Sequence, residues 1–256
     1  MLTKWPAIGA KRTEVREYRS ADGEERLWYE SEEIERLVED ELVRAKLMPS
    51  ISNPVVDLEA FVEVYLKCAL DQYRPLPAEV LGVTEFQRGQ QPRISLNSDL
   101  TGSALDDHDA SQGIRGRWRA TLAHEACHVL LHRILFEFDD NQGELFAVPT
   151  PRSEQLLRCL KRDVGYGVRA PDWREVQANS GMGALLMPKR LFTRSVRAEL
   201  NSLGKTSADL TAGNSAVIEL SRRLAKRFNV SAQAARIRLN TTGYLGDPSA
   251  PPLTEY

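Results

Sequence analysis

The chain has 256 residues, a hydrophobic fraction of 42% and a formal net charge of −2. These values exclude a disordered chain and a protein that binds nucleic acid through its overall charge. A chain of this length can bury a hydrophobic core without disulfides. No apolar run approaches the roughly 20 residues of a membrane span, and the first residues lack the apolar core of a signal peptide. The three cysteines have no paired spacing, so we expect reduced thiols, a cytoplasmic location and no membrane partner.

Residues 1–50 are predicted to form an N-terminal hairpin and an acidic helix. The pair Asp22-Gly23 favours a tight turn between two short strands. Nine acids lie between Glu24 and Glu41, and the apolar residues of this segment recur at helical spacing. The pattern predicts a solvated amphipathic helix, with an acidic docking surface as the alternative interpretation. The apolar positions are Ile34, Leu37, Val38 and Leu42.

A core domain is predicted over residues 51–200. Its first element is a helix that Asp57 caps and that continues to Ala69, with apolar residues along one face. Two strands follow, over residues 80–86 and 93–96, joined by a short loop. Residues 99–116 are polar and contain glycine, which predicts a mobile loop over the cleft.

The second strand is the predicted docking site for an extended peptide. Pro92 has no N–H group to donate to a ladder, which favours an edge position for the strand that follows it. An edge strand accepts a peptide by β-augmentation. The expected substrate strand comprises Arg93, Ile94, Ser95, Leu96 and Asn97.

Three further helices are predicted in the core. The most apolar one spans residues 117–136, a short one lies around residues 154–161, and the third runs over residues 171–186. The central helix carries three of the four histidines within nine residues. It also carries one glutamate among small and apolar residues, and burying that charge requires an explanation.

The spacing of these polar residues supplies the explanation. His124 and His128 are separated by four residues, so they lie one helical turn apart on one face, with about 6 Å between their Cβ atoms. Two imidazole nitrogens in this arrangement can converge on one metal ion. Glu125 lies about 100° around the helix from His124, from where its carboxylate reaches a water on the ion. This is the HExxH pattern of two zinc ligands and a catalytic general base, and two satisfied core histidines are the alternative.

His132 lies one further turn along the helix. Ligands at positions i, i+4 and i+8 would spread over about 12 Å of helix axis, too far for one ion. We therefore expect His132 to contact a ligand or to pack in the core. Cys127 faces away from the histidines and is expected to be a core thiol, and His108 is expected in a solvated loop.

A catalytic zinc site normally has three protein ligands, so a third is needed. Glu175 is the best candidate, because it lies in the first turns of an otherwise apolar helix. Asn179 follows one turn later on the same face and is placed to hydrogen-bond a ligand histidine. Taken alone, Glu175 also fits an ordinary acid at a helix N-terminus.

These segments together resemble the ImmA/IrrE family of metallo-endopeptidases. The resemblance rests on the run from Arg117 to His132 and on Glu175-Val-Gln-Ala-Asn179 with the following Leu-Leu-Met-Pro188, and it covers roughly residues 50–195. It implies that His124, His128 and Glu175 bind Zn²⁺, that Glu125 is the general base, and that His132 is not a ligand. It also implies a specific protein substrate, a transcriptional repressor or antitoxin in a stress or mobile-element circuit.

The sequence departs from the family pattern in two places. After the Asn, the family usually has a Phe-Ala pair, whereas this chain has a run that contains Gly181 and Gly183. Each glycine weakens a helix by about 1 kcal/mol relative to alanine. The family often has an N-terminal helix-turn-helix, which residues 1–50 do not resemble. The sequence does not identify the residue that would stabilise the oxyanion. Tyr166 is a candidate without further support.

Residues 201–246 are predicted to form a C-terminal helical module, followed by a flexible tail over residues 247–256. Helices are expected over residues 214–228 and 231–239, and this helix-turn-helix pattern carries six Lys or Arg from Val217 to Asn240. We favour a packing module, because the second helix is rich in small and apolar residues. DNA binding through Arg236 and Arg238, or zinc sensing without peptidase activity, are the alternatives.

The predicted fold is thus α+β. It comprises a zincin-like core, in which a small sheet packs on the HExxH helix, and the C-terminal helix-turn-helix-like module.

Overall fold

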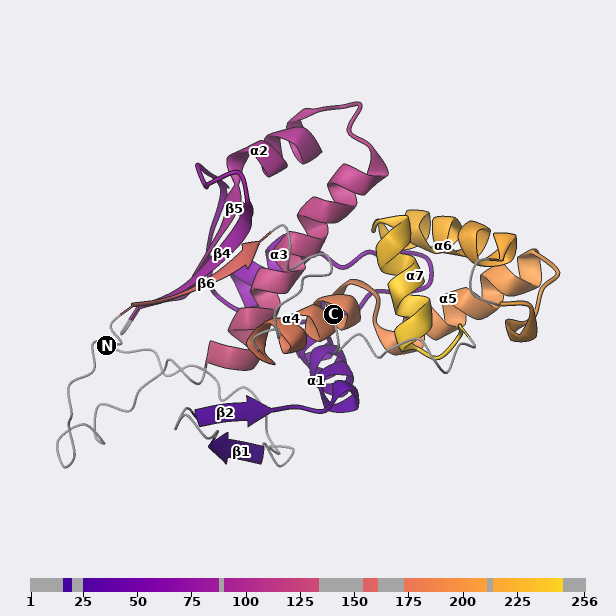
Figure 1. The fold of residues 1–256 in the computed structure, drawn as a ribbon, viewed down its shortest axis with the longest axis horizontal. Helices are drawn as coiled ribbons and strands as arrows, with labels where there is room; N and C mark the ends of the chain where they lie inside the picture. Colours follow the sequence, from indigo (N-terminus) through magenta and orange to yellow (C-terminus); the bar gives the residue numbers. More distant parts are fainter. Residues whose placement is uncertain are drawn as a thin grey trace.

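The computed structural model describes residues 16–19, 25–87, 90–133, 154–160, 173–210 and 214–245. Their elements confirm the α+β class. The long helix α3 (Gln112–His132) lies between a four-stranded sheet and helix α4 (Trp173–Leu186), as Figure 1 shows. Because α3 has neighbours on both sides, nearly every residue from Trp118 to its end is buried. No helix in these ranges is long and apolar enough to cross a bilayer.

The predicted N-terminal hairpin and acidic helix are both present. Strands β1 (Arg16–Arg19) and β2 (Glu25–Trp28) pair antiparallel in a sheet of their own, and the residues of the predicted turn lie outside the described ranges. Helix α1 (Ser31–Arg44) begins with a capping box in which the Glu30 N–H donates to Glu33 Oε2 at 2.8 Å. Its apolar stripe is buried at Ile34, Val38 and Leu42.

The main sheet has the strand order β3-β5-β4-β6. Strands β4 (Val80–Gln87) and β5 (Arg93–Asn97) form the predicted antiparallel hairpin. Strand β3 (Ala69–Arg74) runs parallel to β5, and β6 (Glu154–Leu160) runs antiparallel to β4. In the described part of the sheet the edges are therefore β3 and β6.

The predicted edge position of residues 93–97 is wrong, because β5 has a neighbour on each side. Pro92 stands just before the strand, so its missing N–H removes no bond from either ladder. Its carbonyl accepts the N–H of Ala69 at 2.9 Å and so opens the pairing with β3. The proline therefore marks where the strand begins rather than where the sheet ends.

Two predicted helices are also corrected. The segment expected to be helical around residues 154–161 is strand β6, because pairing with β4 outweighs the helical preference of its leucines. The helix expected from Asp57 to Ala69 ends at Leu66, with a π-helical turn η1 (Ala60–Tyr65), and Ala69 begins β3. Lys67 adopts a left-handed conformation, with φ of 54°, which ends the helix.

The polar segment expected to be a loop over residues 99–116 is largely helical. Asn97 caps α2 (Ser98–Thr101) by accepting the N–H of Asp99 at 2.9 Å, and the π-helical turn η2 (Gly102–Asp106) follows. Ser111 caps α3 by accepting the N–H of Ile114 at 3.3 Å. Short polar side chains here act as helix caps rather than as loop residues.

The C-terminal helices match their predicted positions closely. Helix α5 (Lys189–Ser202) leads through the 3₁₀ turn η4 (Ser207–Asp209) to α6 (Ser215–Phe228) and α7 (Ala232–Thr241). The predicted domain boundary at residue 200 falls inside α5, which packs on α6 through Phe192 and Phe228, with ring centroids 5.7 Å apart. The predicted tail, residues 247–256, lies outside the described ranges.

The turn between α6 and α7 is docked on the N-terminal part of α3. A Cβ atom at Gly116 would lie 2.5 Å from the backbone nitrogen of Ser231 and 2.9 Å from the carbonyl carbon of Val230. Gln112 Nε2 donates to the carbonyl of Val230 at 3.0 Å. Only glycine at position 116 permits this approach, which joins the C-terminal helices to the helix that carries the histidines.

Arg238 joins α7 to two other elements. Its guanidinium is 4% exposed, forms an ion pair with Glu35 of α1, and donates through Nε and Nη2 to the carbonyl of Met187, at 3.0 and 2.8 Å. Met187 directly follows α4, so one side chain fixes α7, α1 and the end of α4 relative to one another.

Substituting Arg238→Met should therefore lower the free energy of unfolding by about 3 kcal/mol, because Glu35 and the Met187 carbonyl lose their buried partner. Urea unfolding at neutral pH measures the change. The exposed Arg236 on the same helix provides the control, and Arg236→Met should change stability by about 0.5 kcal/mol or less. Equal losses in the two variants would contradict this role for Arg238.

Candidate metal centre

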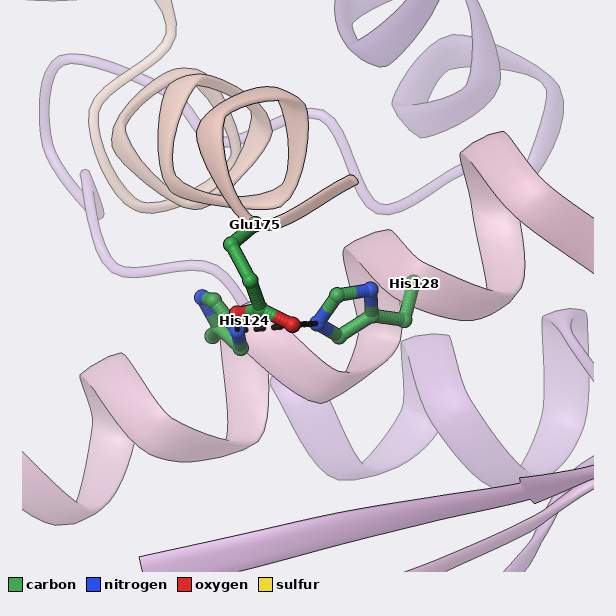
Figure 2. A group of neighbouring side chains, drawn as sticks. All are labelled: His124, His128 and Glu175. Carbon is green, nitrogen blue, oxygen red and sulfur yellow. Dashed lines mark hydrogen bonds and ion pairs between the residues drawn. The ribbon is translucent and has the colours of Figure 1, made fainter. Parts of the chain in front are cut away.

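Two helices bring three potential metal ligands together. His124 and His128 lie one turn apart on α3, and Glu175 lies in the first turn of α4, which crosses over them. Figure 2 shows the Glu175 carboxylate reaching from α4 to both imidazole rings. The two histidines are fully buried and Glu175 is 16% exposed, so the cluster lies at the α3–α4 contact.

The donor atoms converge on one point. The Nε2 atoms of His124 and His128 are 2.9 Å apart, and they lie 3.0 and 3.3 Å from Oε2 and Oε1 of Glu175. All three ligand atoms fall within 4.8 Å of one another. Two nitrogens bound to one Zn²⁺ at about 2.0–2.1 Å in a tetrahedral site lie about 3.3 Å apart. The arrangement therefore fits a metal ion after movements of a few tenths of an ångström.

The opposite nitrogen of each ring has its own partner. Nδ1 of His124 lies 3.1 Å from Oδ1 of Asn179, the residue predicted to support a ligand. Nδ1 of His128 lies 3.3 Å from Nδ1 of His132, which is outside the ligand group. Asn179 Oδ1 accepts a hydrogen bond, so His124 carries its proton on Nδ1 and presents the lone pair of Nε2 to the centre.

Sequence reasoning missed the residues around His132. Its Nε2 atom lies 3.1 Å from Oε1 of Gln177, and its ring meets the Trp173 ring edge-on at a centroid distance of 5.4 Å. Both partners come from the first turns of α4. Gln177 falls between Glu175 and Asn179 in sequence, and a third polar residue among the apolar residues of that helix was the available signal.

The ionisable residues of the centre shift one another's pKa values. Burial opposes ionisation of Glu175, but hydrogen bonds to His124 and His128 and their charges outweigh it and hold the pKa of Glu175 well below its usual range. Burial likewise favours neutral His124, yet Glu175 and then Glu125 raise the pKa of His124 above its usual value. Burial and the neighbouring His128 lower the pKa of His132 to about 3, so His132 is neutral at physiological pH.

The Glu125 carboxylate meets strand β4 of the sheet. The hydroxyl of Thr84 on β4 donates to Oε2 of Glu125 at 2.5 Å, and Glu125 is fully buried. A Cβ atom at Gly82 would lie 2.7 Å from Oε1 of Glu125, so only glycine leaves space for the carboxylate. Glu125 is not in the ligand group, although its charge acts on His124. Gly82 inside a strand was a sequence signal for a close approach.

The predicted substrate strand, β5, is not available to a peptide in the way that the sequence suggested. Ile94 and Leu96 are buried in the core, and Ser95 accepts a hydrogen bond from Arg74 Nη1 at 3.2 Å. Asn97 is also buried and donates to the carbonyl of Val80 at 2.8 Å. Arg93 is exposed beside the β4–β5 loop. With β3 and β4 on either side, this strand has no free edge for a peptide.

Cys127 is fully buried, as expected of a core thiol. The prediction that it faces away from the histidines is wrong, because it meets α4, the helix that also covers His124 and His128. A Cβ atom at Gly181 would lie 2.8 Å from its sulfur, whereas one at Gly183 would have no neighbour within 4 Å. Gly181 therefore permits the close approach of α4 that carries Glu175 to the histidines. Gly183 has no such role and only weakens the helix.

No family model matches the chain, and a search of the curated proteins finds no significant match. The resemblance to the ImmA/IrrE family therefore rests on the motif residues themselves.

The two glycines of α4 give a matched pair of substitutions. Gly181→Ala should lower the free energy of unfolding by about 1–3 kcal/mol and weaken zinc binding, because the new methyl group pushes α4 away from Cys127. Gly183→Ala should raise stability by up to about 1 kcal/mol and leave zinc binding unchanged. Thermal unfolding and zinc titration measure both effects. Identical behaviour of the two variants would mean that the α3–α4 approach does not control the centre.

The pKa shifts of Glu175 and His124 predict how the metal-free protein responds to pH. The depressed pKa of Glu175 gives stability that is present above its unfolded pKa, about 4.3, and is lost as the pH falls through the folded value. The raised pKa of His124 gives stability that is present below its unfolded pKa, about 6.5, and is lost as the pH rises through the folded value.

Metal-free wild type should therefore exceed Glu175→Gln in stability most strongly between about pH 4.3 and 6.5, with a smaller difference at higher pH. Urea unfolding in the presence of a chelator measures this difference. Zinc binding should follow the opposite trend and strengthen as the pH rises, because the ligand imidazoles must be neutral. A stability difference that grows toward pH 9 would contradict the pairing.

Proposed function

We propose that the chain is a zinc-dependent endopeptidase with a zincin-like core that cleaves a specific protein substrate. One observation carries the proposal: His124, His128 and Glu175 converge on a single point, while Glu125, adjacent to His124, stays outside the ligand group. Two imidazoles and one carboxylate are a recurrent ligand set of hydrolytic zinc enzymes, which keep a fourth position for water.

The residues divide the chemistry among them. Zn²⁺ held by His124, His128 and Glu175 would supply Lewis acidity to a water and to a peptide carbonyl. Glu125 is the group that takes the proton of the attacking water and returns it to the leaving amine. Thr84 donates to Oε2 of Glu125 and so fixes the orientation of this carboxylate. Tyr166, the candidate for stabilising the oxyanion, lies outside the described residues.

The proposed substrate is a transcriptional repressor or an antitoxin. Its support is the resemblance of the two motif segments to the ImmA/IrrE family, whose members act on proteins of regulatory circuits. A peptide would have to approach without using β5 as an edge strand, since that strand is enclosed by β3 and β4.

The alternative is a DNA-binding or zinc-sensing protein without peptidase activity. The DNA-binding alternative needs both Arg236 and Arg238 of α7 to be accessible. Arg238 is buried against Glu35 and Met187, and the N-terminal end of α7 is docked on Gly116, so only Arg236 of the pair is exposed. These contacts favour a packing role for the C-terminal helices.

A metal analysis combined with a cleavage assay tests the proposal. Wild type and Glu125→Gln should each bind one zinc, and Glu125→Gln should cleave the product of a neighbouring gene about 10²–10⁴-fold more slowly. Glu63→Gln, at an exposed position far from the histidines in the sequence, is the matched control and should cleave as wild type does.

Each other outcome has a defined meaning. Cleavage by Glu125→Gln at the wild-type rate would exclude Glu125 as the base. Stoichiometric zinc in the wild type without cleavage of any such protein would favour the zinc-sensing alternative. A wild type that binds no zinc would overturn the metal centre.

A further inference from the structure

A buried chain of hydrogen-bonding groups runs from α4 to one of the ligand histidines. Gln177 Oε1 lies 3.1 Å from Nε2 of His132, and Nδ1 of His132 lies 3.3 Å from Nδ1 of His128. Gln177 is 3% exposed, and both histidines are fully buried. The three groups therefore satisfy one another without contact with bulk water.

We propose that Gln177 is a positioning residue that acts through His132 to hold His128 in the tautomer that presents Nε2 to a metal. The proposal rests on the proposed metal-binding function and adds a residue that the ligand motif does not contain.

The direction of the hydrogen bonds follows from the first group in the chain. A carbonyl oxygen only accepts, so the His132 nitrogen that faces Gln177, Nε2, must carry the proton. A neutral imidazole has one N–H and one lone pair, so Nδ1 of His132 accepts. His128 therefore donates from Nδ1, and the lone pair of its Nε2 atom points toward Nε2 of His124 and the Glu175 carboxylate.

The opposite orientation of the Gln177 amide would reverse every step. An N–H group facing His132 would require Nε2 of His132 to accept, so its Nδ1 would carry the proton. His128 would then accept at Nδ1 and carry its own proton on Nε2, the atom that must bind the metal. The amide of Gln177 therefore decides whether His128 is a ligand.

The two ligand histidines reach α4 in different ways. His124 contacts the Asn179 amide directly, whereas His128 is connected to the Gln177 amide through an intervening imidazole. The ring of Trp173 meets His132 edge-on and limits its rotation. This arrangement gives His132 a defined role although it lies too far along α3 to join the ligand group.

Removing the acceptor should be costly because no bulk water reaches the site to replace it. Outer partners of ligand histidines typically contribute about 10–100-fold to metal affinity. Gln177→Leu keeps a similar volume and deletes the amide, so its zinc affinity should fall by about this factor. Gln177→Glu keeps an oxygen acceptor opposite Nε2 of His132 and should retain most of the wild-type affinity.

The test measures zinc affinity by competition with a chromophoric chelator, together with ¹⁵N NMR of the histidine side chains. Zinc-loaded wild type should show His132 protonated on Nε2 and His128 protonated on Nδ1. Leu185→Val is the control for packing, since Leu185 is buried in the same helix about two turns beyond Gln177. It should bind zinc as wild type does.

Three results would overturn the proposal: His132 protonated on Nδ1, Gln177→Leu with wild-type zinc affinity, or an equal loss of affinity in Leu185→Val. Failure of the proposed function looks different. A wild type that binds zinc but cleaves nothing leaves both readouts intact. If the wild type binds no zinc, the proposed metal centre is wrong. The histidine tautomers of the metal-free protein, measured by NMR, then show whether Gln177 orients His132.

Discussion

The contact between α3 and α4 is the constraint on which the site depends. It brings the Glu175 carboxylate within 3.3 Å of two imidazole nitrogens from another helix, in a place that is almost closed to water. Glu175 and Glu125 both place negative charge near His124. In the metal-free protein this charge raises the pKa of His124, so that a proton partly replaces the ion. The ligand geometry and this negative charge are both suited to a metal cation.

Both faces of α3 are adapted to the polar residues that the helix carries. On the side of α4, Gly181 permits the close approach, and the amides of Gln177 and Asn179 meet the outer nitrogens of the histidines. On the side of the sheet, Gly82 leaves space for Glu125 and Thr84 donates to it. Burial of four polar residues in one helix is tolerated because each meets a polar partner at a defined distance.

The sequence was informative where spacing alone determines proximity. The separation of His124 and His128 by one helical turn predicts their convergence, and the apolar context predicts their burial. Helix α6 begins within a residue of its predicted start, whereas α3 begins at Gln112, five residues before the start predicted for it. Glu175 needed the motif to identify it, because a lone acid in the first turn of a helix is common.

The errors arise where a distant partner decides the local structure. The leucine-rich segment of β6 becomes a strand only because β4 is available to pair with it. Pro92 favours an edge strand in isolation, yet β3 supplies a second neighbour from a segment in which no strand was predicted. Gln177, Gly82 and Thr84 have roles that depend on which side chains face them, and no periodicity in the sequence encodes this.

We propose that two imidazoles and one carboxylate form a single zinc centre. X-ray absorption spectroscopy of the zinc-loaded protein tests it directly. The zinc should have a first shell of nitrogen and oxygen at about 2.0–2.1 Å, with outer-shell scattering from two imidazole rings. A third imidazole, or a sulfur ligand at about 2.3 Å, would contradict it by placing His132 or a cysteine where Glu175 is expected.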